Sequence, residues 1–86
     1  MREFPYLADA ISHVVESYRK NTHMTKTALA DFSGLERRYL LEIERGTKKP
    51  TVNAVYSICE ALNVSPVEFF AKVEEERLRL VNEGKK

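Results

Sequence analysis

The chain has 86 residues, of which 43% are hydrophobic and 31% are charged, and its formal net charge is +1. These values are typical of one globular domain with a single modest core and do not favour a disordered chain, and the length excludes two separate domains. The single cysteine, Cys59, excludes an intrachain disulfide, and the N-terminal region lacks the uninterrupted apolar run of a signal peptide or membrane span.

Apolar residues near the N-terminus recur at three- and four-residue steps and predict a first helix with one buried face. They are Phe4, Leu7, Ile11, Val14, Val15 and Tyr18. Pro5 is compatible with the first helical position because the N–H group there has no partner within the helix. We expect this helix to end near Asn21 and Thr22.

Two short helices joined by a tight turn are predicted over residues 24–46. Thr25 is a suitable N-cap for the first of them, over residues 26–32, and the second spans residues 36–44. The apolar residues of the two segments are Leu29, Ala30, Leu35, Leu40 and Ile43. Gly34 lies at the break, where glycine can supply a left-handed turn conformation, so the order indicates a helix-turn-helix.

Residues 46–50 are predicted to form a basic loop, because its first glycine caps the preceding helix and its final proline cannot continue it. Thr51 then caps a fourth helix that ends at Asn63. The predicted apolar stripe of that helix is Val52, Val55, Ile58, Cys59 and Leu62. Ser65 followed by Pro66 marks the start of a fifth helix, with a hydroxyl cap and a proline at the first position.

Beyond the fifth helix's first two turns, the chain is charged and only Leu78 and Val81 continue an apolar stripe. This segment is either a helical extension that packs on a partner chain or a frayed, solvated tail. No strand-like alternation is present, so the predicted fold class is all-α. We expect a helix-turn-helix DNA-binding domain over residues 1–72 and a charged C-terminal extension or tail over residues 73–86.

Basic residues are concentrated in residues 19–49, which hold eight basic and four acidic residues, whereas the remainder holds six and nine. Such a positive segment is typical of nucleic-acid binding, although an ordinary mixed surface explains the charge alone equally well. If Leu40 and Ile43 face inward, the helical period turns several side chains outward. These are Glu36, Arg37, Arg38, Leu41, Glu42 and Arg45.

That outer face has groups suited to a DNA major groove, because an arginine fork can bind guanine and a carboxylate can accept a hydrogen bond from cytosine N4. Lys26, Lys48 and Lys49 are placed to contact flanking phosphates. The alternative is a merely solvated charged face. The helix-turn-helix spacing makes DNA binding the better hypothesis.

Catalysis finds little support in the sequence. His13 and His23 lack metal-ligand spacing with Cys59, and neither has an obvious nucleophile partner. We therefore expect no enzyme activity, no metal site, no cofactor and no small-molecule ligand.

The predicted helix-turn-helix and the helices around it resemble the phage repressor and Cro class of regulators, the XRE family. The resemblance extends over residues 7–70. The most specific pieces are residues 43–46 followed by Pro50, and residues 58–66 leading to residues 69–70. The resemblance implies a five-helix, lambda-repressor-like domain that binds operator DNA as a homodimer.

The resemblance also implies roles for single residues. Lys26 falls where the family anchors its second helix to DNA, and Tyr39 falls on a position that often contacts phosphate. The base-reading positions are occupied by Glu36, Arg37, Arg38 and Glu42. Arg19 and Glu44 match an ion pair between the first and third helices. Glu36 departs from the family pattern, since a small hydroxyl residue usually caps the recognition helix there.

The sequence therefore predicts a cytoplasmic transcriptional regulator that binds a two-fold related operator as a homodimer. Phe69, Phe70 and Val73 are expected at the dimer interface, because few partners remain for them once four helices enclose the core. Residues 34–46 most resemble controller proteins of restriction-modification systems, while phage-type and toxin-antitoxin repressors are alternatives. A rival interpretation is an antitoxin-type protein-interaction module in which DNA binding is secondary or absent.

Overall fold

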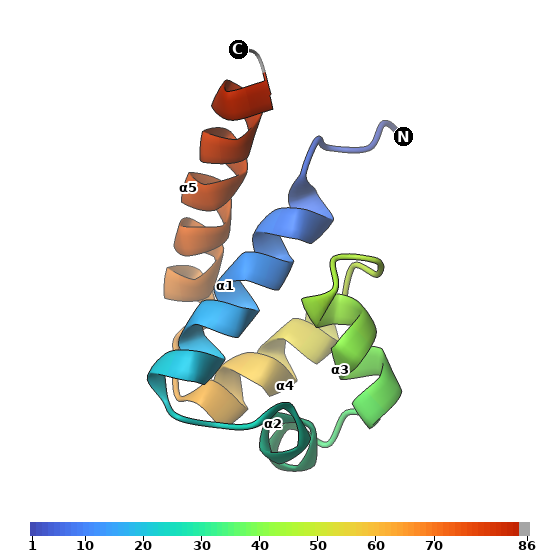
Figure 1. The fold of residues 1–86 in the computed structure, drawn as a ribbon, viewed down its shortest axis with the longest axis vertical. Helices are drawn as coiled ribbons and strands as arrows, with labels where there is room; N and C mark the ends of the chain where they lie inside the picture. The colour runs from blue at the N-terminus through green and yellow to red at the C-terminus, as the bar shows by residue number, and fades with distance from the viewer. Residues whose placement is uncertain (85–86) are drawn as a thin grey trace.

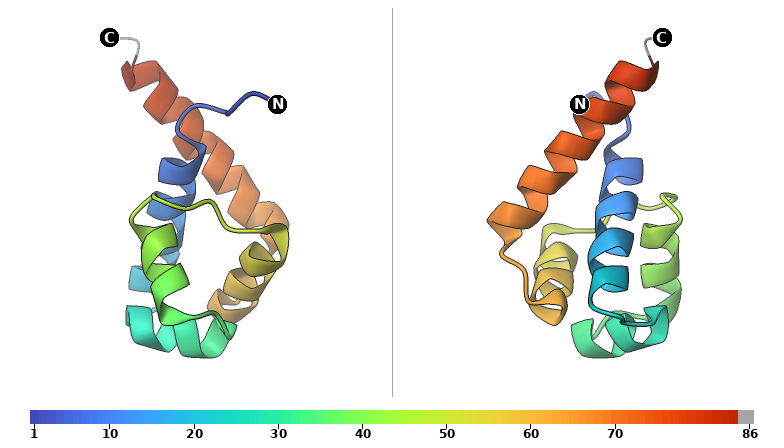
Figure 2. Two further views of the ribbon diagram at one scale, coloured as in Figure 1. Left: turned by 90° about the vertical axis from the view of Figure 1, so that its right-hand side faces the viewer. Right: turned by 60° about the vertical axis from the view of Figure 1, so that its left-hand side comes forward.

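Five helices and no strand make up residues 1–84, the part of the chain that the computed structural model describes (Figure 1). They are α1 (Leu7–Asn21), α2 (Lys26–Ser33), α3 (Arg37–Glu44), α4 (Val52–Leu62) and α5 (Pro66–Gly84). Lys85 and Lys86, the end of the predicted C-terminal extension, lie outside the described residues. In Figures 1 and 2, α1 runs through the middle of the molecule, with α5 on one side and α3 on the other. The expected five-helix, all-α fold is confirmed.

All five helices contribute fully buried apolar side chains to one core. The residues with no exposed surface are Ala10, Val15, Leu29, Leu40, Ile43, Ile58 and Phe69. Burial of a large aliphatic or aromatic side chain contributes roughly 1.5–3 kcal/mol to stability. The core therefore holds the short helices α2 and α3 in place, since neither is long enough to be stable alone.

Side-chain caps fix the beginnings of three helices, as the sequence predicted. The hydroxyls of Thr25 and Thr51 accept hydrogen bonds of 3.0 and 3.1 Å from backbone N–H groups three residues further along α2 and α4. Ser65 accepts one of 3.1 Å from the backbone N–H of Val67. Each such cap satisfies a donor that the helix itself leaves without a partner.

The first helix begins later than its apolar pattern predicted. Tyr6 is the N-cap of α1 and has a left-handed backbone, with φ of 63°, so Pro5 precedes the helix. Phe4 is 50% exposed and contacts the guanidinium group of Arg77, whose central carbon is 5.8 Å from its ring centroid. The prediction that Val52 belongs to the buried stripe of α4 is wrong. Val52 is the first residue of that helix, next to the loop, and it is 67% exposed.

The expectation that Phe69 and Val73 contact a second chain is wrong. They are 0% and 2% exposed, because this side of α5 packs on α1, where Tyr18 stacks on Phe69 with ring centroids 6.3 Å apart. Phe70 is 40% exposed. Of the three predicted residues, only Phe70 therefore remains exposed on α5. The helix itself continues without a break through Gly84.

A buried ion pair connects α1 with α3. Arg19 donates from Nε and Nη2 to the two carboxylate oxygens of Glu44, at 2.9 and 3.1 Å. The two side chains are 10% and 0% exposed. Arg19 also donates from Nη1 to the carbonyl oxygen of Met24, at 2.9 Å, and Ser12 donates to the carbonyl oxygen of Glu44. These bonds fix α3 on α1 and on the turn before α2.

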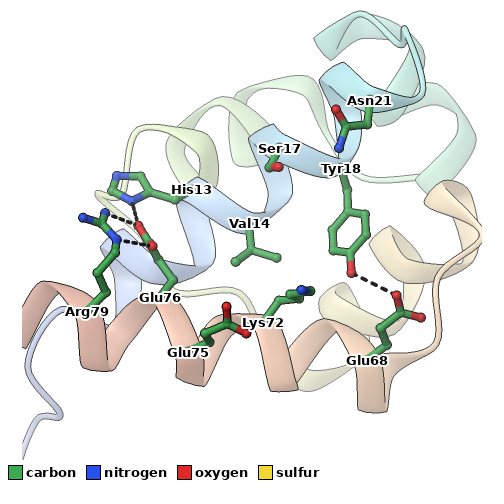
Figure 3. A pocket seen from close by; sticks show the side chains of 10 residues that line it. All are labelled: His13, Val14, Ser17, Tyr18, Asn21, Glu68, Lys72, Glu75, Glu76 and Arg79. Atoms are coloured by element: carbon green, nitrogen blue, oxygen red, sulfur yellow. Dashed lines mark hydrogen bonds and ion pairs between the residues drawn. The ribbon is translucent and has the colours of Figure 1, made fainter.

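A groove of about 680 Å³ lies between α1 and α5 (Figure 3). His13 on α1 approaches the carboxylate of Glu76 on α5, with 2.6 Å between Nδ1 and Oε2, and Arg79 donates to the same oxygen at 2.7 Å. The hydroxyl of Tyr18 donates to Glu68 at 3.5 Å. Polar contacts thus join the two helices across the groove.

Replacing Glu44 with alanine is expected to destabilise the protein strongly. Arg19 would be left as a buried charge without its partner, which typically costs about 3–5 kcal/mol of unfolding free energy. Urea unfolding followed by circular dichroism measures the loss. The control is Glu16→Ala, which breaks an exposed pair with Lys20 and should cost ~1 kcal/mol or less. Equal, small losses for both variants would contradict the structural role of the buried pair.

Acid is expected to weaken the polar contacts of Glu76, which are made with Arg79 within α5 and with His13 across the groove. Hydrogen bonds from Arg79 and then from His13 lower the pKa of Glu76 from 4.5 to about 2. Because the pKa is lower in the folded state, the stabilisation is fully present above about pH 4.5 and is lost as the pH falls towards 2. The unfolding free energy of Glu76→Gln should therefore fall less steeply over this range than that of the wild type.

The neighbouring Glu75→Gln variant serves as the control for this measurement, because it removes the same charge from the same turn of α5. A difference between the two variants therefore reports the contacts of Glu76 and not the loss of one charge. Parallel curves for Glu76→Gln and the wild type would show that the contacts to Glu76 do not stabilise the folded state.

Candidate nucleic-acid interface

A rigid helix pair presents one outer face of α3 to solvent. Leu29 and Ala30 of α2 and Leu40 and Ile43 of α3 are at most 4% exposed and lie in the common core. Gly34 between the helices has φ of +73°, and a Cβ atom there would meet no other atom within 4 Å. Glycine is needed at this position for the backbone conformation alone. The left view of Figure 2 looks onto the exposed side of α3.

The predicted DNA-contacting residues are all at the surface. They are Lys26, Glu36, Arg37, Arg38, Tyr39, Glu42, Arg45, Lys48 and Lys49, and each is exposed or partly exposed. Arg38, Glu42 and Arg45 follow one another at steps of four and three residues, so they form a row along one face of α3. Arg37 lies beside this row, about 100° around the helix from Arg38.

Glu42 is the centre of a small charged cluster on this face. It accepts a hydrogen bond of 3.2 Å from Nε of Arg38, and Nζ of Lys48 lies 3.3 Å from its other oxygen. Lys48 first, and then Arg38, hold the pKa of the Glu42 carboxyl below its ordinary value of 4.5. The carboxylate is therefore ionised at neutral pH and bound to both cations.

Tyr39 connects α3 with the start of α4, a role that the sequence did not indicate. Its hydroxyl oxygen accepts a hydrogen bond of 3.1 Å from the backbone N–H of Thr51. Its ring centroid lies 5.6 Å from Nζ of Lys48, within the range of a cation–π contact. The hydroxyl hydrogen is not used in the bond to Thr51, so it remains suited to donation to a phosphate oxygen.

The loop between α3 and α4 is held against α1 and the N-terminal segment. Gly46 has φ of +76°, and a Cβ atom there would lie only 2.9 Å from Oδ1 of Asp9 on α1. Lys49 forms an ion pair with Glu3. Sequence reasoning missed Glu3, because the two residues are 46 positions apart and no periodic pattern connects them.

The face contains many hydrogen-bond donors but no set of groups arranged for metal binding. Within residues 1–84, no three His, Cys, Asp or Glu side chains lie together as metal ligands.

Over the same part of the chain, every helix is too short or too polar to cross a membrane. Cys59 is buried, which raises the pKa of its thiol.

Comparison with known proteins places these elements in a family. Residues 15–69 match the family model HTH_3, described as Helix-turn-helix. The uncharacterized HTH-type transcriptional regulator Rv0474 of Mycobacterium tuberculosis is 37% identical over 51 residues, which are 59% of this chain. The chain spans only 36% of that regulator's length. The control protein C.SmaI of Serratia marcescens is 31% identical over 62 residues, which are 72% of this chain and 74% of that protein.

The restriction-modification controller protein C.Esp1396I has a similar structure. It is 34% identical in sequence, with a TM-score of 0.79 over 86% of this chain and 96% of that one. A structure of the same controller as a tetramer in complex with its natural 35 base-pair operator matches with a TM-score of 0.78.

Proposed function

Since this chain belongs to the XRE-type helix-turn-helix family, we propose that it is a transcriptional regulator that binds a specific operator in double-stranded DNA. The observation that carries the proposal is the row of Arg38, Glu42 and Arg45 along the exposed face of α3, with the basic loop at its end. A helix of this kind, supported by a second helix, fits a major groove. Selection of bound sequences from a random duplex pool tests the proposal.

The DNA-facing residues divide into two classes according to their place on this surface. Arg37 and Arg38 lie at the N-terminal end of α3, the end from which helix-turn-helix proteins reach base edges. Lys48 and Lys49 lie in the loop after α3, and Lys26 is the first residue of α2. We assign base reading to the two arginines and phosphate binding to the three lysines. Tyr39 has the phenol hydrogen to bind a phosphate beside them.

The protein is proposed to act as a homodimer on a two-fold related operator. The outer side of α5 carries Val67, Phe70 and Leu78, which are 82%, 40% and 48% exposed. They lie on one side of the helix, with the exposed Glu74 between Phe70 and Leu78. A second copy can cover these apolar side chains in a self-complementary contact. Two α3 helices would then enter successive major grooves, with half-site centres about 10 bp apart.

A restriction-modification controller is the more specific candidate, supported by the similarity to C.SmaI and C.Esp1396I. The rival is an antitoxin-type module whose main partner is a protein. The exposed basic side chains around α3 favour DNA, because lysine and arginine side chains at a surface can neutralise backbone phosphates. A gel shift with genomic DNA fragments separates the two.

Alanine at Arg37 or Arg38 is expected to weaken binding to the operator much more than binding to a scrambled duplex. A bidentate arginine–guanine pair discriminates between bases by ~1–3 kcal/mol, whereas phosphate binding carries no direct sequence information. Alanine at Lys48 or Lys49 should weaken both duplexes alike and reduce the log–log salt slope by about one for each lysine–phosphate pair removed. Fluorescence anisotropy across a salt series measures both effects. Equal weakening on both duplexes for the arginine variants would mean that another face of α3 enters the groove.

Aspartate at Val67 or Leu78 is expected to dissociate the dimer, because a charge would then be buried in the contact between the α5 helices. The control is Val52→Asp, which changes another exposed valine on a different helix. Sedimentation equilibrium at tens of micromolar should show a dimer for the wild type and the control and a monomer for the α5 variants. A monomeric wild type would refute the dimer proposal.

A further inference from the structure

The carboxylate of Glu42 lies between cations that come from two different elements. Arg38 is one turn earlier on α3 and donates to Oε1 at 3.2 Å, while Lys48 is in the following loop and lies 3.3 Å from Oε2. Both oxygens of Glu42 therefore have a cationic partner. The amino group of a cytosine would have to compete with these two charges for the same oxygens.

The bond to Glu42 leaves the end of the Arg38 side chain available. An arginine has five N–H groups, and this bond uses the one on Nε. The N–H groups of Nη1 and Nη2 can still reach O6 and N7 of a guanine. Arg38 is otherwise free to move, since its side chain is 89% exposed. Holding it in one direction before DNA arrives lowers the entropy cost of binding.

Lys48 is restrained by the same carboxylate and by the ring of Tyr39, which lies 5.6 Å from its Nζ. Glu42 thus sets the position of one residue assigned to a base and one assigned to the backbone. The cluster of Arg38, Glu42 and Lys48 carries a net positive charge, so the carboxylate is compensated where it approaches DNA phosphates. An uncompensated carboxylate at this place would be repelled by them.

We propose that Glu42 is a positioning residue. It directs Arg38 towards a guanine base and Lys48 towards the DNA phosphates, and it makes no base contact of its own. The inference rests on the proposed function, because it assigns the division of roles within the same DNA-binding face. It replaces the expectation that this carboxylate reads cytosine.

The test compares wild type, Glu42→Ala, Arg38→Ala and the double variant. Each is titrated with the selected operator, with its single base-pair variants and with a scrambled duplex at one salt concentration. Glu42→Ala should lower the ratio of operator to scrambled affinity by about two- to five-fold, the upper part of the range expected for exposed ion pairs. Among the single base-pair variants of the operator, Glu42→Ala should lose discrimination at the same base pair as Arg38→Ala. In the Arg38→Ala background, Glu42→Ala should lower the ratio no further.

Glu3→Ala is the matched control, because it also removes one negative charge and breaks the ion pair of Lys49, which lies in the same loop as Lys48. It should tighten binding to both duplexes alike and leave the ratio unchanged. Thermal melts of the Glu42 variants should lie within several degrees of the wild type, since the carboxylate is 25% exposed and belongs to no core cluster. A ratio that falls equally for Glu3→Ala would attribute the effect to net charge and overturn the proposal.

Two other results would overturn it. A loss of discrimination at a base pair that Arg38 does not affect, or a further fall in the double variant, would make Glu42 a direct base reader. An unchanged ratio in Glu42→Ala, with a wild type that discriminates between the duplexes, would remove any role in specificity. A wild type that binds operator and scrambled DNA equally contradicts the proposed function itself, and the inference with it.

Discussion

The orientation of α3 depends on the buried contact between Arg19 and Glu44. A charge pair excluded from water stabilises a structure only when its geometry is good, and here two parallel hydrogen bonds satisfy that requirement. The remaining bonds of these two residues, with Met24 and Ser12, extend the same network to the turn before α2 and to the middle of α1. The exposed row on α3 is therefore fixed by polar bonds on its opposite side, and apolar packing of Leu40 and Ile43 completes the attachment.

Features that depend on neighbouring residues could be predicted from the sequence. Thr25, Thr51 and Ser65 were recognisable as caps because each hydroxyl bonds a backbone N–H only two or three residues further along the sequence. The break at Gly34 and the apolar spacing of α2 and α3 defined the helix pair for the same reason. The family resemblance, confirmed by the match over residues 15–69, supplied the arrangement of the helices and the expectation that Arg19 meets Glu44.

Features that depend on which segments meet in space could not be predicted in this way. Periodicity showed that Phe69 and Val73 share an apolar face, but not that α1 rather than a second chain covers it. Val52 fits the apolar stripe of α4 by its spacing and yet is exposed. A residue is buried only where another segment covers its side of the helix, and spacing alone does not show which segments do so. The contacts of Tyr39 with Thr51 and of Lys49 with Glu3 join separate parts of the chain, and no local pattern indicates them.

The pairing of basic residues with carboxylates on this face affects how the protein would search a genome. Glu42 and Glu3 offset part of the charge of Arg38, Lys48 and Lys49, and the whole chain has a formal net charge of only +1. Attraction to arbitrary DNA grows with the number of phosphates neutralised, so a compensated surface holds arbitrary sequence weakly. Genomic DNA offers about 10⁶–10⁹ competing sites, and a regulator present in few copies would otherwise be held on them. If the protein binds an operator as proposed, such a surface leaves more copies of it free to reach that site.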